Sequence, residues 1–115
     1  MSAPGCVLAV DQGTAGTRAI VFDGEGHPLA SAQVPITQIY PAPEEVEQDP
    51  EEIWRSVVVA GRAALRDIPP RSVKALGITN QRETTIVWER GCDPMFSRFH
   101  DLQAIVIRLS RGYTP

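Results

Sequence analysis

The chain has 115 residues, of which 43% are hydrophobic and 22% charged, and its net charge of −3 leaves no basic surface for nucleic acid. No apolar run approaches the roughly 20 residues that cross a bilayer, and the first six residues lack the charged and apolar regions of a secretory signal. Cys6 and Cys92 have no C-x-x-C spacing, so the sequence implies neither a zinc site nor a disulfide framework, and we expect one small cytoplasmic domain with free thiols.

The N-terminal third of the sequence predicts an antiparallel meander of three strands. Residues 6–10 and 18–22 are short, apolar and rich in β-branched side chains, which favours buried strands. Residues 23–28 supply two glycines and a proline, a strong turn signal, and residues 29–36 alternate apolar and small polar side chains as a half-exposed strand does. The turn at residues 13–17 is longer than a simple hairpin needs, which indicates that it holds something.

A surface loop and one helix are predicted next. Residues 38–50 carry three prolines and four acidic residues, which is typical of an ordered loop. Asp49 has the features of a helix N-cap, with Pro50 at the first helical position and Glu52 three residues after the cap. Apolar and small residues recur at helical spacing and predict the packed face: Ile53, Val57, Gly61, Ala64 and Leu65. Three arginines are expected to face water: Arg55, Arg62 and Arg66.

The remaining segments complete an α/β pattern with a mixed sheet. Two prolines within residues 67–72 end the helix, and residues 73–79 and 84–88 predict two more strands joined by a polar corner. Residues 101–112 place Leu102 and three further apolar residues at helical spacing after a plausible Asp101 cap, which predicts a helix. The run "AIVI" within it also suits a buried strand.

The first strand and its turn combine groups that suit a magnesium-bound phosphate. Asp11 places a carboxylate at the mouth of the sheet, and Thr14 adds a hydroxyl. The flanking glycines would let backbone amides converge as an anion-binding nest, and Arg18 supplies a cation. A plain glycine-rich hairpin with solvated charges explains the same pattern, and the pattern alone does not separate the two interpretations.

The corner "NQRETT" carries a second group of polar residues. Arg82 and Glu83 offer donors and acceptors side by side, which a small polyhydroxy compound requires. The alternative is an exposed ion pair on a loop, and an isolated Arg-Glu dipeptide favours that alternative.

Three stretches resemble the N-terminal segment of glycerol kinases, within the FGGY family of carbohydrate kinases: "LAVDQGTAGTRAIVFD", "QIYPAPEEVEQDPEEIW" and "ALGITNQRETTIVWER". The resemblance implies a partial ribonuclease H-like lobe of the actin and sugar-kinase superfamily, with the active site between two such lobes. It implies ATP-dependent phosphorylation of glycerol to glycerol 3-phosphate, with Mg²⁺ as cofactor. Glycerol and ATP are the partners that it implies for the complete enzyme.

The resemblance also assigns roles to individual positions. Asp11 matches the aspartate that organises Mg²⁺, and Arg82 and Glu83 match the pair that hydrogen-bonds glycerol. Thr14 matches a hydroxyl near the transferred phosphate and the substrate. The nucleotide and phosphate contacts fall on one run of residues: Gln12, Gly13, Thr14, Ala15, Gly16 and Arg18. No catalytic residue is expected in this chain, because the family's general base lies further along its sequence.

The match covers residues 7–90 nearly continuously. We interpret residues 1–90 as the N-terminal part of the first lobe, and residues 91–115 diverge. A truncation or a reading-frame change near Gly91 would explain that tail, in which Ile107 stands where the family has a tryptophan. Ala15 and Gly16 also depart from the Thr or Ser that many members carry. We therefore expect the isolated chain to be inactive and to self-associate through uncovered apolar surface.

Two other functions remain open on the sequence. The chain could belong to an FGGY kinase for another polyol or sugar, although "NQRETT" is the glycerol-type corner. It could instead be a non-catalytic module that binds a partner or oligomerises through its unpaired sheet edges.

Overall fold

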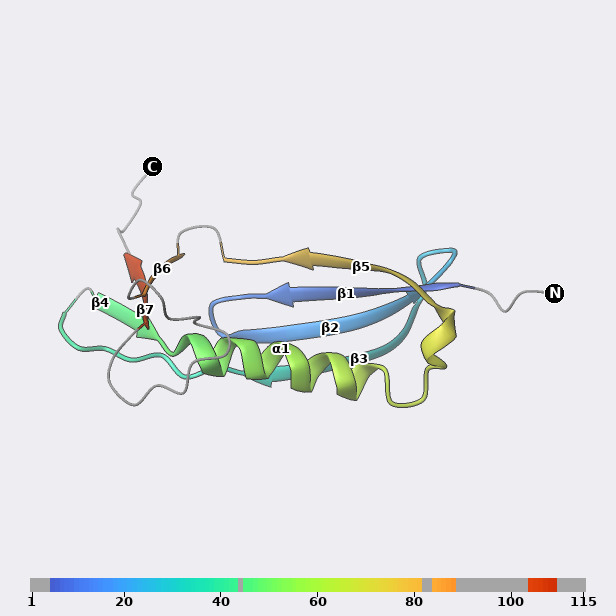
Figure 1. The fold of residues 1–115 in the computed structure, drawn as a ribbon, viewed down its shortest axis with the longest axis horizontal. Helices are drawn as coiled ribbons and strands as arrows, with labels where there is room; N and C mark the ends of the chain where they lie inside the picture. Colours follow the sequence, from blue (N-terminus) through green and yellow to red (C-terminus); the bar gives the residue numbers. More distant parts are fainter. Residues whose placement is uncertain (1–4, 44, 82–83, 89–103, 110–115) are drawn as a thin grey trace.

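The computed structural model describes residues 5–43, 45–81, 84–88 and 104–109, which form two sheets and one long helix (Figure 1). The larger sheet has the order β3-β2-β1-β5 and consists of β1 (Cys6–Gln12), β2 (Gly16–Asp23), β3 (Pro28–Pro35) and β5 (Val73–Thr79). The smaller sheet has the order β4-β7-β6 and consists of β4 (Glu45–Gln48), β6 (Thr84–Trp88) and β7 (Ala104–Leu109). The helix α1 spans Pro50–Ala64, and a 3₁₀ turn, η1, spans Pro70–Ser72.

The larger sheet confirms the predicted meander and the predicted mixed topology. β1 pairs antiparallel with β2, and β2 pairs antiparallel with β3. β5 returns after α1 and pairs parallel with β1. The carboxyl ends of β1 and β5 therefore meet at one end of the molecule, where the turn of residues 13–16 and the start of α1 also lie (Figure 1).

The core lies between α1 and one face of the larger sheet. Its fully buried members are small: Cys6, Ala19, Val21, Ala60 and Ala64. Small side chains on both the helix and the strands let the helix axis approach the sheet closely, and larger, partly buried residues such as Leu8 and Val34 surround this contact. The opposite face of the sheet has no helix on it among the described residues (Figure 1).

The predicted N-cap of α1 is confirmed. Asp49 accepts the amide of Glu51 at 2.9 Å, and Pro50 occupies the first turn. Glu52 does not complete a capping box, because its carboxylate accepts both the amide and the hydroxyl of Thr37, at 2.8 and 2.9 Å. The first turn of the helix thus fastens the chain that leaves β3.

The face of α1 that packs on the sheet includes only part of the predicted set of residues. Gly61 and Ala64 are buried as expected, whereas Ile53, Val57 and Leu65 are only half-buried. The structure adds three buried positions to this face: Pro50, Ser56 and Ala60. The three arginines expected to face water are exposed. The helix ends at Ala64, several residues before the first proline, with Leu65 as its C-cap.

Two sequence predictions about loops and helices are wrong. Residues 38–50 do not form a loop alone, because they contain β4 and a backbone bridge between Ile39 and Glu47, with N···O distances of 2.8 and 2.7 Å. The helix predicted over residues 101–112 is wrong at Ala104–Leu109, which form β7 between β4 and β6. Pairing on both edges satisfies the backbone of this β-branched run, and local periodicity carries no information about such partners.

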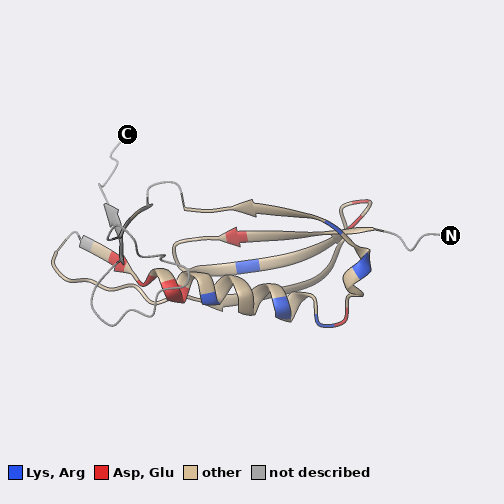
Figure 2. Ribbon diagram, in the orientation of Figure 1, with Lys and Arg blue, Asp and Glu red and all other residues tan. Residues whose placement is uncertain are grey.

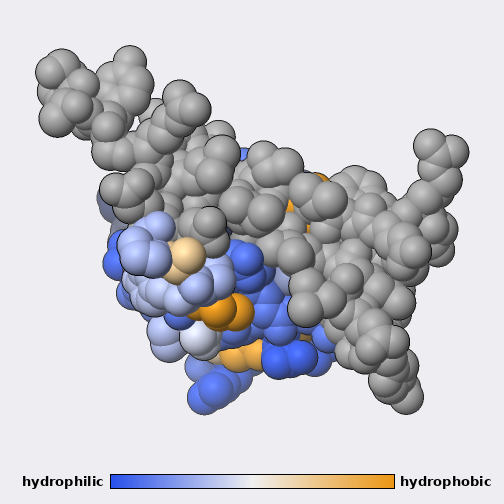
Figure 3. Space-filling model, turned by 90° about the vertical axis from the view of Figure 1, so that its left-hand side faces the viewer, coloured by the Kyte–Doolittle hydropathy of each residue, from blue (hydrophilic) through white to orange (hydrophobic). Residues whose placement is uncertain are grey.

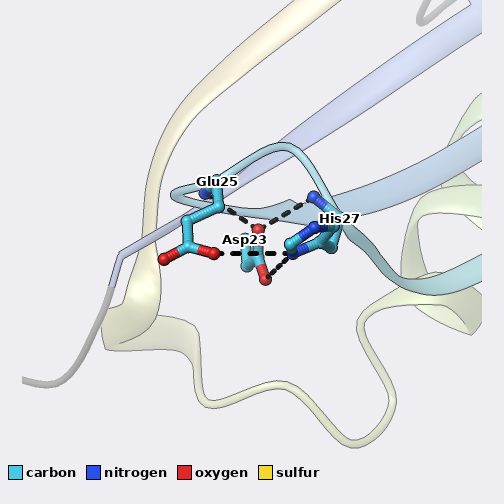
Figure 4. Close-up of polar contacts among 3 residues, drawn as sticks. All are labelled: Asp23, Glu25 and His27. Atoms are coloured by element: carbon cyan, nitrogen blue, oxygen red, sulfur yellow. Dashed lines mark hydrogen bonds and ion pairs between the residues drawn. The ribbon is translucent and has the colours of Figure 1, made fainter.

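The turn between β2 and β3 is held by Asp23 (Figure 4). Its carboxylate accepts the amides of Glu25 and His27, each at 2.9 Å, and lies 3.3 Å from the His27 ring. The backbone hydrogen bond from His27 is the main cause that holds the pKa of Asp23 below its ordinary value of 3.8. Gly26 completes the turn with a φ of +86°, as the predicted turn at residues 23–28 requires.

Apolar side chains remain exposed on β5. Leu76 is 58% exposed and Ile78 is 69% exposed, and in the described part of the chain β5 is an edge strand. Among the described residues, no helix combines the length and hydropathy of a membrane span.

Candidate functional site

Asp11 and Arg18 lie directly opposite each other on the sheet face that α1 does not cover. They are cross-strand partners on β1 and β2, and Thr79 on β5 flanks Asp11 on its other side. In Figure 2 the acidic segment of β1 lies beside the basic segment of β2. The alternation of strands explains this placement, because Val10 and Gln12, the neighbours of Asp11, are buried and Asp11 is exposed.

These three side chains line a hollow of about 350 Å³. The rest of its lining is apolar and consists of Ala9, Val10, Ile20, Gly77 and Ile78. Among the described residues the carboxylate of Asp11 has no hydrogen bond or ion pair, and the guanidinium of Arg18 contacts only Gln33, at 3.5 Å. Both charges are therefore available to a ligand.

The turn of residues 13–16 directs its carbonyl oxygens into the protein and leaves the amide of Ala15 without an acceptor among the described residues. Each of its four carbonyl oxygens accepts a hydrogen bond from the protein. Gln12 Nε2 donates to Gly13 at 2.9 Å, Gln48 Nε2 to Thr14 at 2.9 Å, Ile36 N to Ala15 at 3.1 Å, and Gly13 N to Gly16 at 2.8 Å. The amide of exposed Ala15 has no acceptor within the described part of the chain. An anion at this turn would thus meet an N–H group, with the carbonyl dipoles directed into the protein.

The glycines of this turn act differently from the prediction. Neither Gly13 nor Gly16 has a positive φ, and the amide of Gly13 is used within the turn. Gly16 is required for close approach, since a Cβ there would lie 2.6 Å from the carbonyl oxygen of Val34 on β3. The turn therefore supplies fewer amide donors than the sequence suggested.

Four glutamines form a partly buried network beneath the turn, and of these only Gln12 was expected at the site from the sequence. Gln48 is 2% exposed and Gln12 is 7% exposed. Gln81 Nε2 donates to Gln48 Oε1 at 2.7 Å and to Gln12 Oε1 at 3.1 Å, and Gln48 Nε2 donates to Gln38 Oε1 at 2.9 Å. Gln38 also donates to the Thr14 carbonyl. No local motif joins residues so far apart in sequence, so only the fold reveals the network.

Thr17 belongs to the core and not to the site. It is fully buried on the helix side of β2, and its hydroxyl lies 2.6 Å from that of Ser56 on α1. Ser56 donates to the carbonyl of Ile53, so Thr17 is the donor to Ser56. This contact ties the strand that carries Arg18 to the helix.

The donor set of the hollow suits one kind of metal. Among the described residues no group of three or more His, Cys, Asp or Glu side chains gathers in one place, so a cage made wholly of protein ligands is not present there. One unpaired carboxylate beside an arginine instead fits Mg²⁺, which is commonly held by one or two carboxylates together with substrate phosphates. Asp11 is the residue that would hold it.

Comparison with known proteins decides the family. Residues 6–98 match the N-terminal domain of the FGGY family of carbohydrate kinases. The chain belongs to the FGGY family. This FGGY segment is 55% identical over 86 residues to a glycerol kinase of Paracidovorax citrulli, and 51% identical over 87 residues to one of Rhodospirillum centenum. These alignments cover 73% and 74% of the chain, which spans only 17% and 18% of the two relatives.

Solved structures confirm the predicted lobe. The FGGY segment superposes on a crystal structure of Plasmodium falciparum glycerol kinase with ADP, with a TM-score of 0.64 and 26% identity over 74% of this chain and 18% of that one. It also superposes on a xylulose kinase from Brucella ovis, with a TM-score of 0.69 and 23% identity over 94% of this chain and 22% of that one. At 23% identity, the similarity to the Brucella ovis protein shows a shared fold and nothing about substrate.

The predicted substrate pair, Arg82 and Glu83, lies outside the described residues. Gln81, which precedes the pair, is half-buried and belongs to the glutamine network. The structure thus brings Asp11, Arg18 and the turn together, and places the last described residue before the corner within hydrogen-bonding distance of Gln12. At this end of the FGGY segment the described surface is largely hydrophilic (Figure 3).

Proposed function

We propose that this segment provides the phosphate-binding surface and part of the glycerol-binding surface of an ATP-dependent glycerol kinase. The observation that carries the proposal is the cross-strand couple of Asp11 and Arg18 beside the turn of residues 13–16, where the Asp11 carboxylate has no hydrogen bond or ion pair with another described residue. It occurs in a segment 55% identical to a glycerol kinase. The reaction would convert glycerol to glycerol 3-phosphate.

Each group of the hollow has a role in this proposal. Asp11 would hold Mg²⁺, which neutralises charge on the transferring phosphoryl group when it is bound. Arg18 contacts phosphate oxygens from the neighbouring strand, and the amide of Ala15 donates to them from the turn. Phosphoryl transfer depends mainly on positioning and charge stabilisation, and the two central strands of the sheet, β1 and β2, hold Asp11 and Arg18 in place.

The glycerol assignment depends on Arg82 and Glu83. We propose that their donors and acceptors bind the substrate hydroxyls. Gln12 and Gln81 are joined by a hydrogen bond of 3.1 Å, which supports a position for this corner beside the phosphate turn. A ligand that spans a phosphate and a hydroxyl would need that proximity.

We propose that residues 1–90 form one part of the first lobe and that the chain alone does not turn over glycerol. Asp11 is the only carboxylate lining the hollow within the described part of the chain, and the metal would occupy it. A general base must therefore come from elsewhere. Phosphate contacts open to solvent are also screened, at about 1 kcal/mol or less each.

A chimera tests the function directly. The aligned segment of the Paracidovorax citrulli glycerol kinase would be replaced by this one, and glycerol 3-phosphate formation measured. We expect activity that Asp11→Asn abolishes, and an increase of about tenfold or more in the KM for glycerol on Arg82→Ala, because one lost polar contact to a substrate costs roughly 1–3 kcal/mol. Arg71→Ala, an exposed arginine on η1, is the matched control and should change neither value.

Two results would count against the proposal. A folded chimera that phosphorylates another polyol in preference to glycerol would reassign the substrate. Glycerol kinetics left unchanged by Arg82→Ala would remove the corner from the site. The purified 115-residue chain, assayed beside its Asp11→Ala variant, should show no turnover above that variant.

A further inference from the structure

The glutamine network connects three separate segments through one side chain, Gln48. Its Nε2 donates to the Thr14 carbonyl and to Gln38 Oε1, each at 2.9 Å, and its Oε1 accepts from Gln81 at 2.7 Å. Gln48 is the last residue of β4 and only 2% exposed. The primary amide of glutamine has two N–H donors and one carbonyl acceptor. These groups match two oxygen partners, on Thr14 and Gln38, and one N–H partner, on Gln81.

This arrangement determines which groups of the turn face a ligand. The Thr14 carbonyl receives amide donors from both Gln38 and Gln48 and is thereby held toward the interior. A carbonyl released from these donors would be able to rotate toward the hollow, where its negative end opposes a phosphate. The network thus keeps acceptors away from the place where an anion would bind.

The same side chain also fixes the residue before the predicted substrate pair. Gln81 donates to both Gln48 and Gln12, and Gln12 in turn donates to the Gly13 carbonyl. Residue 81 is therefore tied to the turn by two routes, one through Gln48 and one through Gln12. Buried polar networks of this kind specify one arrangement when every member is satisfied.

We propose that Gln48 is a positioning residue that holds the turn of residues 13–16 in its anion-accepting orientation and ties it to the chain entering Arg82 and Glu83. The significance of that orientation for phosphate rests on the proposed function, whereas the positioning itself does not. Gln48 touches no ligand in this scheme and acts only through Thr14, Gln38 and Gln81.

Two substitutions separate hydrogen bonding from space filling. Gln48→Met keeps the length and volume of the side chain and removes all three hydrogen bonds. Gln48→Glu keeps the oxygen that accepts from Gln81, but it places a carboxylate against the oxygens of Thr14 and Gln38. Ser72→Ala is the matched control, because it removes a buried hydroxyl bonded to the Pro69 carbonyl at the opposite end of the sheet.

The first measurement is amide hydrogen exchange by NMR on the full, ligand-free chain. In both Gln48 variants, protection should fall roughly five- to tenfold at the amides of Gly13 and Ile36, which close the turn. The side-chain amide resonances of Gln81 should shift in Gln48→Met and stay near their wild-type positions in Gln48→Glu. Ser72→Ala should leave the turn unchanged. If a Gln48 variant does not fold, Gln38→Met, which removes one donor from Thr14, should cause a smaller loss of exchange protection at Gly13 and Ile36.

The second measurement is titration with magnesium pyrophosphate, followed at the Ala15 amide. The Gln48 variants should weaken binding roughly five- to tenfold, and Asp11→Asn should abolish it with turn protection intact. Wild-type chain that does not bind pyrophosphate would contradict the phosphate assignment, while the exchange data would still decide the positioning. Turn protection in Gln48→Met equal to wild type would overturn the proposal, because Gln48 would then only fill space.

Discussion

The hydroxyl pair between Thr17 and Ser56 should show a measurable coupling energy in the unfolding of this chain. Thr17 is 0% exposed and Ser56 is 3% exposed, so water cannot replace either partner. Ser56→Ala leaves the Thr17 hydroxyl as a buried donor without its acceptor, 2.6 Å away in the native chain, and should cost roughly 1–3 kcal/mol. Thr17→Val leaves Ser56 bonded to Ile53 at 2.6 Å and should cost about 1 kcal/mol.

The coupling energy is measured as a double-mutant cycle, by urea denaturation followed with far-UV circular dichroism. The double variant Thr17→Val, Ser56→Ala leaves no unpaired hydroxyl, and it should be more stable than the sum of the single effects predicts by about 1 kcal/mol. A urea slope equal to that of wild type is the control that the unfolded state is unchanged. Additivity within about 0.5 kcal/mol would refute the reasoning, because the two hydroxyls would then be energetically independent.

Three further predictions follow from other parts of the fold. Gly16→Ala should destabilise the chain by roughly 1–3 kcal/mol in urea denaturation, since its Cβ would lie 2.6 Å from the Val34 carbonyl oxygen, and Gly77→Ala, whose Cβ would meet nothing within 4 Å, should be nearly neutral. Because the pKa of Asp23 is lowered in the folded chain, its contribution to stability is complete above its ordinary value of 3.8 and is lost as pH falls through the lowered pKa. In an NMR titration of the wild-type chain, the amide chemical shifts of Glu25 and His27 should change as Asp23 is protonated at acid pH. Asp23→Asn should remove this change, and a variant that titrates like wild type would show that another group causes it. Leu76→Lys, at a 58% exposed position on the edge strand β5, should reduce the concentration-dependent association we expect in sedimentation velocity, whereas a monodisperse wild-type monomer would show that no association exists to reduce.

The sequence was informative wherever a short segment determines its own structure. The Asp49 cap, the turn at residues 23–28 and the strands β1, β2, β3 and β5 depend on local residue types, and the structure confirms them. Asp11 and Arg18 were grouped from the sequence as neighbours across one turn, and the structure adds that they are direct cross-strand partners. Each of these features involves few partners and little separation along the chain.

The errors share a different cause, which is dependence on distant partners. Residues 104–109 become a strand because β4 and β6 supply edges on both sides, and residues 45–48 become one because β7 pairs with them. The glutamine network requires Gln81 to meet Gln12 across 69 positions, and no spacing rule anticipates that. Gly16 was expected to let backbone amides converge on an anion, but its close approach to Val34 on β3 is what requires glycine.

The alternation along β1 makes the phase of this strand as important as its composition. Val10 and Gln12 face the helix side and Asp11 faces the hollow, so inserting one residue ahead of Asp11 would turn the carboxylate into the core and a buried apolar side chain outward. Inserting two residues would restore the phase and displace the carboxylate along the strand without burying it. We therefore expect β1 to tolerate insertions of two residues better than insertions of one, whereas the exposed turn of residues 24–27 is not subject to this alternation.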